Sequence, residues 1–373
     1  MDYVHILKNK SQLEFGGRSR FTTIANDYDV NRLEDNIITT IPEFSDETNY
    51  KENVTAFYGQ YAKSFEKFKF QIGIRTETTN IDITTKNNAE KVSRNYTDVF
   101  PSSFLDYQFN DNNSIRFSIS RRIRRPRRDA LVPFSSFSDS RNIFVGNPGV
   151  NPSYVILTEL AFESKLSNKF TLAPTLFFRR TKQAIDYFIQ KEDISINGNM
   201  EEVFVTRTVN IGTDKSYGLE LDFIYKPINW LNIYNEVTLN GYQQYGSYKS
   251  KDFDANGFAF GGRLHLNFKV SNSFRFQFQN RFRGANNRGQ LSRKALYRLD
   301  FGMSQSLFNN NASLSVNFKD IFDSWEWDIR TRGADFSQDI KSQVRVPQLN
   351  ISFIYRWNQK RYKGKKGQQY DRL

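Results

Sequence analysis

Hydrophobic and polar residues alternate along most of the chain with a period of two. In residues 67–75, Phe68, Phe70, Ile72 and Ile74 occupy one set of positions, and polar residues such as Lys69 lie between them. The alternation recurs in six further segments, at residues 114–121, 231–240, 260–269, 273–282, 312–319 and 349–357. A period of two indicates β-strands with two different faces. The pattern therefore predicts an all-β fold.

The apolar faces of these segments carry no charge in their middle, although 25% of the residues are charged. In a lipid bilayer an Arg or Lys at mid-depth costs roughly 2–4 kcal/mol, which gives this exclusion a physical cause. Arg121 and Arg180 occupy apolar positions, but only at strand ends, where a long side chain can reach the interface. A soluble antiparallel sandwich also alternates in this way, with its apolar faces packed inward.

The connections between the predicted strands favour a membrane barrel over a sandwich, because short and long connections alternate strictly. Tight polar turns are expected near Asn9, Glu66, Asp111, Asn168, Pro227, Ser271 and Asn310. Long excursions are expected over residues 27–50, 81–95, 125–152, 190–202, 246–256, 284–290 and 324–342. Short turns on one rim and long loops on the other are typical of an outer-membrane barrel with its long loops outside the cell. We therefore predict a transmembrane antiparallel β-barrel.

The pattern predicts an odd number of strands, about 15, from seven tight turns and a last segment ending near Trp357. Single-chain bacterial barrels normally have an even number, with both termini on the periplasmic side. Here the first strand runs into a periplasmic turn, so it starts at the extracellular rim. An open sheet edge in lipid leaves backbone groups unpaired at several kcal/mol each. We therefore expect an incomplete portion of a larger barrel, with at least one strand before Met1.

Composition narrows the chemistry. The 373 residues include 35 Phe and 19 Tyr but no Cys and only two His, His5 and His265. Thiol chemistry and Cys-based metal sites are excluded, and nucleotide, EF-hand and zinc motifs are absent. Glu77, Glu159 and Glu220 are scattered carboxylates of the kind that a barrel interior normally contains. We expect no catalysis and no cofactor; the acidic stretch at residues 252–257 suggests either a Ca²⁺ loop or, more simply, a solvated turn.

Two further features concern the ends of the chain and its hydropathy. No stretch approaches 18 uninterrupted apolar residues, which excludes a membrane-spanning helix. The first ten residues contain no basic segment followed by an apolar one, so no secretory signal is visible. From this we expect a mature form or a fragment.

Several motifs, in order along the chain, resemble the outer-membrane β-barrel domain of TonB-dependent receptors, particularly the Bacteroidetes-type branch. They are FQIGIRTE at residues 70–77, YTDVFPSSFLDYQF at 96–109, ISRRIRRP at 119–126, GNPGVNPS at 146–153 and NIGTDKSYGLEL at 210–221. Ser153 departs from the acidic residue usual at its position, and the chain end lacks the terminal aromatic residue common in barrel assembly signals. The resemblance covers most of the chain.

The resemblance implies a specific architecture and function. Family members are 22-stranded barrels around an N-terminal plug that contacts TonB. Residues 1–357 would then be the C-terminal portion of such a barrel without its plug, and residues 358–373 a polar, basic periplasmic tail. The implied location is the cell outer membrane. The implied partners are membrane lipid, lipopolysaccharide, the missing plug and N-terminal strands, TonB through that plug, and a nutrient of the siderophore, peptide or glycan class.

Arginine dominates the sharpest local motif, RRIRRPRR at residues 121–128. We interpret it as the outer end of a strand that enters a long loop. Such arginines can pair with plug carboxylates, lipopolysaccharide phosphates or an anionic ligand, or with carboxylates inside the barrel. The predicted contact residues at the lumen rim, for ligand or plug, are Arg122, Arg124, Arg125, Arg263, Arg275 and Arg281.

Two other hypotheses compete with a nutrient receptor. One is a passive porin or a structural outer-membrane barrel that never carries a plug. The other is a soluble basic β protein that binds acidic polymers, since the net charge of +13 would permit nucleic acid as a partner. We expect no nucleic-acid partner, because the arginine run lies where a strand end and a loop are predicted.

Overall fold

The computed structural model describes residues 1–9, 11–86, 91–133, 135–139, 141–196, 198–249, 251–343 and 345–357. The polar tail expected at residues 358–373 lies outside them. No helix among the described residues is long and apolar enough to cross a membrane.

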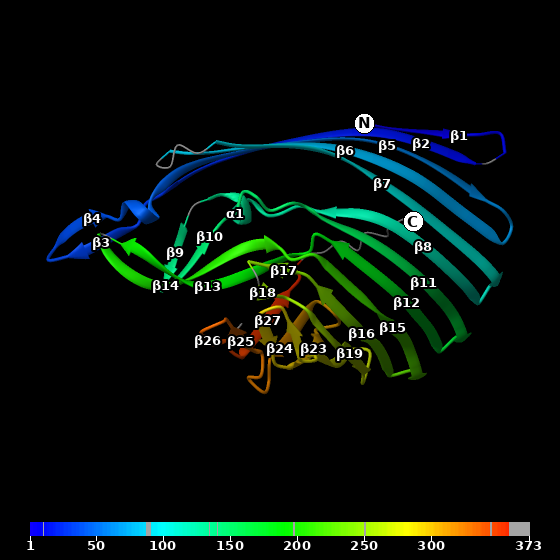
Figure 1. The fold of residues 1–373 in the computed structure, drawn as a ribbon. Coiled ribbons are helices and arrows are strands. Elements are labelled where there is room, and N and C mark those ends of the chain that lie inside the picture. The colour runs from blue at the N-terminus through cyan, green and yellow to red at the C-terminus, as the bar shows by residue number, and fades with distance from the viewer. Residues whose placement is uncertain are drawn as a thin grey trace.

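Fifteen strands form one large antiparallel sheet that curls into a deep arc, with β1 and β27 at its two edges (Figure 1). In spatial order they are β1 (Asp2–Ile6), β2 (Gln12–Tyr28), β5 (Asp46–Ser64), β6 (Phe68–Thr85), β7 (Lys91–Asn110), β8 (Asn113–Arg124), β11 (Ser153–Ser167), β12 (Phe170–Lys182), β15 (Thr213–Ile228), β16 (Leu231–Tyr245), β19 (Ala255–Lys269), β20 (Phe274–Arg283), β23 (Leu296–Leu307), β24 (Ala312–Lys319) and β27 (Gln348–Tyr355). The all-β prediction and the strand count are confirmed. The sandwich alternative is wrong, because the large sheet is one curved layer that fits a partial barrel.

Seven tight turns join the strands in pairs, as the sequence predicts. The first lies between Ile6 and Gln12, and the others lie at residues 65–67, 111–112, 168–169, 229–230, 270–273 and 308–311. The last of them needs left-handed backbone at Phe308, Asn309 and Asn310, with φ of 50°, 51° and 70°. Asn tolerates this conformation better than most residues. In Figure 1 these turns gather at one rim of the arc, whereas the long connections lie at the other.

The long connections fold into small structures of their own. One four-stranded sheet contains β13 (Ile185–Ile196), β14 (Asn199–Asn210), β10 (Asn142–Val145) and β9 (Ser135–Asp139), and another contains β21 (Asn286–Arg288), β22 (Leu291–Arg293), β25 (Glu326–Arg332) and β26 (Ser337–Gln343). Two hairpins, β3 (Asn31–Glu34) with β4 (Ile37–Thr40) and β17 (Ser247–Tyr248) with β18 (Lys251–Asp252), and two short helices, η1 (Pro42–Phe44) and α1 (Arg128–Leu131), complete them. The excursion predicted over residues 190–202 is therefore a longer connection, folded as the β13–β14 hairpin.

Aromatic side chains mark two levels on the outer face of the sheet, eight residues apart along a strand. The pairs are Phe170 and Phe178 on β12, Tyr217 and Tyr225 on β15, Phe260 and Phe268 on β19, and Phe274 and Phe282 on β20. Neighbouring rings meet within each level, as with Phe268 and Phe276, 4.5 Å apart between centroids, and Phe260 and Phe282, 4.8 Å apart. Girdles of this kind flank the apolar band of a membrane barrel, so the outer face between them faces lipid.

Along β6 the apolar residues change from the outer face to the inner face of the sheet. Near the tight turn the apolar residues point outward, and Ile72 and Ile74 remain 50% and 57% exposed. Farther along, Ile81 and Ile83 have the opposite parity, point inward, and are 2% and 0% exposed. They pack with Tyr50, Leu131, Val132 and Val150 in one buried cluster. The strand therefore leaves the lipid near Thr76 and continues as the wall of an extracellular domain whose core lies inside the arc.

This reversal explains why one predicted loop is wrong. Residues 81–95 were expected to form a long excursion, but β6 continues to Thr85 and β7 begins at Lys91, with Thr84 paired to Lys91. The apolar residues move to the other face of β6, but the strand itself continues.

Arg121, an apolar-parity misfit in the sequence, lies where β7 and β8 separate. The pairing between β7 and β8 ends at Ser102 and Ser120. The carbonyl of Val99, farther along β7, therefore has no partner in β8. The guanidinium of Arg121 donates to that carbonyl, lies 3.4 Å from a carboxylate oxygen of Asp98 and stacks 4.6 Å from the ring centroid of Tyr154. The charged side chain of Arg121 therefore supplies a hydrogen-bond donor to a backbone carbonyl that lacks a partner where the two strands diverge.

Candidate functional site: the extracellular mouth

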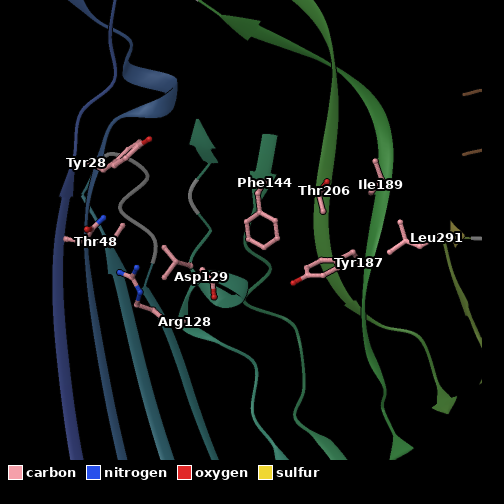
Figure 2. A pocket seen from close by; sticks show the side chains of 11 residues that line it. Tyr28, Thr48, Arg128, Asp129, Phe144, Tyr187, Ile189, Thr206 and Leu291 are labelled. Atoms are coloured by element: carbon pink, nitrogen blue, oxygen red, sulfur yellow. The ribbon is translucent and has the colours of Figure 1, made fainter. Parts of the chain in front are cut away.

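A cavity of about 660 Å³ opens among the long connections, inside the extracellular end of the arc. Its lining residues are Asn26, Tyr28, Thr48, Arg128, Asp129, Val132, Phe144, Tyr187, Ile189, Thr206 and Leu291. We call it the mouth chamber. In Figure 2, Tyr28 and Thr48 lie on one side, Phe144, Tyr187 and Leu291 on the other, and Arg128 and Asp129 between them. Its size suits a small organic ligand, for which cavities of roughly 300–1,000 Å³ are usual.

The chamber is assembled from segments that are far apart in the sequence. Tyr28 ends β2, Thr48 begins β5, Phe144 is on β10, and Tyr187 is on β13. Gln290 fixes the last wall, because its side chain accepts from the amide of Ile189 at 2.8 Å and donates to the carbonyl of the same residue at 2.9 Å. Its shape therefore depends on tertiary contacts between loops.

Arg94 holds the loop that contains the GNPGVNPS motif. Its guanidinium donates to the carbonyl of Pro148 at 2.8 Å, to the carbonyl of Val150, and to the side-chain oxygen of Asn151 at 2.6 Å. Asn210 adds a second link, because its side chain accepts from the amide of Asn151 at 2.7 Å and donates to its carbonyl at 3.0 Å. These contacts fix residues 148–151 against β7 and β14, which gives two of the sequence motifs a structural role.

The chamber carries one cation without an ion-pair partner among the described residues. The carboxylate of Asp129 lies 3.1 Å from the guanidinium of Arg127, outside the chamber lining. Within the described part of the chain, the guanidinium of Arg128 is paired with no carboxylate. The chamber thus presents a positive group beside aromatic and hydroxyl side chains.

Carboxylates of β13, outside the membrane strands, have shifted acidities. Burial raises the pKa of Asp186, even though its carboxylate accepts from the amide of Tyr187 at 2.8 Å and from Gln244 at 3.2 Å. For Glu192, burial acts to raise the pKa, but the ion pair with Arg207 outweighs it and the pKa is lowered. The hairpin beside the chamber therefore contains one carboxyl with a raised pKa and one with a lowered pKa.

The arginines predicted at the lumen rim occupy different environments. Arg125 is tied inside the wall: its guanidinium lies 2.5 Å from a carboxylate oxygen of Glu77 and donates to the hydroxyl of Thr79 at 2.9 Å. Arg75 approaches the other oxygen of Glu77, also at 2.5 Å. Arg122 and Arg124 lie exposed on the inner face of β8, opposite Val155 and Ser153. The RRIRRPRR run is therefore not one patch.

The remaining three predicted arginines lie on the inner wall of β19 and β20. Arg263 stands directly opposite Arg281, and its guanidinium is 3.8 Å from the carboxylate of Glu236. Arg281 lies 5.5 Å above the ring of Trp325. Arg275 lies near the periplasmic turn, opposite Lys269. Their contact with a ligand or plug stays a prediction.

Sequence reasoning missed most of the chamber lining, and it missed Trp325, Trp327, Arg283 and Arg293. Arg283 ends β20 just beyond the segment whose alternation the sequence shows clearly, and Trp325, Trp327 and Arg293 lie in connections without such alternation. The Nε2 atom of His265 lies 3.2 Å from the side-chain oxygen of Gln277 on the inner wall. In the acidic stretch at residues 252–257, the carboxylate of Asp254 accepts from the amide of Gly246 at 2.9 Å.

The lipid-facing girdles, the polar inner wall and the sorted connections define an outer-membrane β-barrel. The chain belongs to the outer membrane protein beta-barrel family, which matches residues 1–355. Its location is the cell outer membrane. None of the curated proteins matches the chain.

Solved structures share the fold at low sequence identity. The FrpB iron transporter from Neisseria meningitidis (F5-1 variant) is 15% identical with a TM-score of 0.61, covering 95% of this chain and 54% of that one. The ferric-catecholate import receptor Fiu from E. coli K12 is 11% identical with a TM-score of 0.64, covering 94% and 53%. The ferric yersiniabactin uptake receptor FyuA from Yersinia pestis is 13% identical with a TM-score of 0.60, covering 92% and 51%. The chain spans about half the length of these structures.

Proposed function

We propose that the chain forms the greater part of the barrel wall of a TonB-dependent receptor that takes up a nutrient through the outer membrane. The observation that carries this proposal is the mouth chamber: segments from four strand connections line a ligand-sized cavity at the extracellular end of a polar inner wall. The similar structures named as iron and siderophore transporters support uptake over a purely structural role.

The proposal includes a plug and further strands. The sheet leaves β1 and β27 unpaired on one side each within the described residues, and unpaired backbone in lipid is costly. Seven additional strands would close a 22-stranded barrel, as the family resemblance implies. The polar inner wall, with Arg122, Arg124 and Arg263 directed into it, would then contact the plug, and TonB would act through that plug. Lipopolysaccharide phosphates are the proposed partner of exposed basic groups at the outer rim.

The nutrient is proposed to belong to the siderophore, peptide or glycan class. All three combine polar groups with apolar surface, which suits a chamber lined by Tyr28, Phe144 and Tyr187 beside Arg128.

The test is energy-dependent uptake in the native host. Deleting the gene should abolish growth on one limiting nutrient and accumulation of that nutrient in radiolabelled form. Accumulation in the parent strain should stop when TonB is deleted or a protonophore is added. Uptake that persists under both treatments, and grows linearly with external concentration, would show a passive porin instead. Recovery of the protein in the soluble fraction would contradict the membrane assignment that both alternatives share.

A further inference from the structure

Three arginines converge at the extracellular end of the inner wall. Arg281 and Arg283 are two residues apart on β20 and therefore share its inner face. Arg293 is on β22, in the small sheet formed by the long connections. Arg283 lies within electrostatic range of both Arg281 and Arg293, which carry its own sign of charge. Bringing three like charges together costs energy, which an anion would offset.

The neighbouring Arg298 forms a close ion pair, whereas these three arginines form none among the described residues; the carboxylate of Asp186 lies only within electrostatic range of Arg293. Arg298, opposite Arg281, pairs with Asp300 through two hydrogen bonds of 2.8 and 2.5 Å. Among the described residues, no carboxylate pairs with Arg281, Arg283 or Arg293. The Nε atom of Arg293 is buried and has no hydrogen-bond partner. A buried N–H without an acceptor is destabilising, so this group is an unfilled donor.

Two tryptophans stand beside the cations. Arg281 lies 5.5 Å from the ring centroid of Trp325, and Arg283 lies 4.2 Å from that of Trp327. The backbone at Trp325 is fixed, because its amide donates to the carboxylate of Asp320 at 3.0 Å. Both rings are half-buried, so part of each remains accessible. The cluster therefore offers flat aromatic surface as well as positive charge.

The cluster is next to the mouth chamber. Leu291 lines the chamber, and Arg293 follows two residues later on the same short strand, so both side chains leave the same face. The arginine cluster therefore adjoins the chamber wall at Leu291.

We propose that Arg281, Arg283 and Arg293, with Trp325 and Trp327, form a binding site for an organic anion that carries a phosphate or carboxylate group on a flat ring. The guanidinium groups hold the anion through charge-assisted hydrogen bonds, and an indole holds the ring. This inference rests on the proposed function, because it assigns the imported nutrient to an anionic class.

Binding to the receptor, purified in detergent as its host produces it, tests the site. Three probes separate the contributions: phenyl phosphate has the anion and the ring, inorganic phosphate only the anion, and benzyl alcohol only the ring. Calorimetry gives the affinities, and tryptophan fluorescence reports contact with the indoles. Phenyl phosphate should bind most tightly and quench the fluorescence. Benzyl alcohol that binds as tightly as phenyl phosphate would overturn the proposal.

Variants locate the binding. Arg283→Gln with Arg293→Gln should weaken phenyl phosphate roughly 10–100-fold, as expected for the loss of charge-assisted hydrogen bonds. Trp325→Leu with Trp327→Leu should weaken phenyl phosphate but leave inorganic phosphate unchanged. Arg330→Gln is the matched control: it removes the same charge from the same small sheet, at an exposed pair with Asp339, and should change nothing.

The outcomes separate this site from its alternatives. If the double arginine variant binds phenyl phosphate like the parent but melts at a lower temperature, the arginines pair with another part of the protein, and the proposal is wrong. If anions bind as proposed but uptake does not depend on TonB, the proposed function fails and the site stands. A variant that does not fold is recognised by the loss of heat-modifiable migration on gels, and the single Arg283→Gln variant, with an expected loss of roughly 10-fold, then decides.

Discussion

The strands at the two ends of the sheet differ in how far they extend beyond the membrane on the extracellular side. Strands β2, β5, β6 and β7 have 17, 19, 18 and 20 residues, far more than a bilayer requires. Strands β20, β23, β24 and β27 have 10, 12, 8 and 8. About 9–11 residues suffice to cross the apolar core. The N-terminal wall therefore rises above the membrane, whereas the C-terminal wall ends near it and passes the chain to a separate small sheet.

The difference shows that alternation must be described by which face of the strand is apolar as well as by its period. In the short strands one apolar face serves from end to end, because the whole strand lies in lipid. In β6 the apolar face changes sides near Thr76, because the solvent of the outer face changes from lipid to water while the inner face gains a core. A strand that crosses two environments is thus two half-strands of opposite parity.

The largest effect is expected for removal of core volume in the extracellular wall. Leu131→Ala should destabilise the packing of α1 on β5 and β6 by about 2–5 kcal/mol, because Leu131 is 1% exposed and packs against Ile81 and Ile83. Hydrogen exchange should accelerate in residues 128–150 but not in the lipid-embedded strand halves. Equal acceleration in both halves would contradict the division of β6. Leu33→Ala, at an exposed position of β3, is the control.

The lipid-embedded half should respond to charge. Ile74→Arg should cost about 2–4 kcal/mol, since it places a cation on the lipid face between the girdles. Unfolding by urea in lipid vesicles measures this loss. The matched variant Gln71→Arg adds the same charge to the inner face of the same strand and should be nearly neutral. A similar cost for both variants would show that the two faces are not distinguished by lipid and water.

A smaller effect is expected where the two halves of β6 meet. Arg125→Gln should cost about 1–3 kcal/mol, because it removes a charged hydrogen-bond donor from Glu77 at the edge of the extracellular core. Combining it with Glu77→Gln should recover part of the loss in a double-mutant cycle. Strict additivity of the two losses would mean that the pair contributes no coupling. Thermal unfolding of the extracellular wall, followed by hydrogen exchange, provides the measurement.

The smallest effect concerns pH. Burial raises the pKa of Asp186, so the folded hairpin binds this proton more tightly than the unfolded chain does. The stability of β13 and β14 should therefore decrease as pH rises from the ordinary carboxyl pKa through the raised value. Asp186→Asn should abolish this decrease and slow hydrogen exchange of the hairpin at neutral pH. A stability that instead rises across that range would show that the neighbouring arginines dominate.

Much of the membrane portion was predictable from sequence because lipid imposes a simple rule on it. The seven tight turns follow from turn residues between alternating segments, and the count of fifteen strands follows from those turns. The extracellular extension of β6 was not predicted, for a definite reason. Ile81 and Ile83 continue the period of two but lie on the opposite face, so a prediction that requires a single apolar face ends the strand too early.

The candidate site was predictable only in part. Arg281 was singled out from its position on a polar face, and it does lie beside Trp325. Its neighbours Arg283 and Arg293 come together only after the connections fold into the β21–β22–β25–β26 sheet. Nothing in the local sequence of Arg122, Arg124 and Arg125 shows that only the third forms an ion pair with Glu77. Such pairings are set by tertiary contacts that a single sequence does not display.

The eight-residue interval between the two aromatic levels sets the thickness of the membrane that the barrel matches. Eight steps of about 3.3 Å give about 26 Å along a strand. A tilt of about 40° reduces this to a height of roughly 20 Å. A bilayer of greater thickness would have to thin around this protein, at fractions of a kcal/mol per Å, which favours residence in the thinner outer membrane over other bacterial membranes.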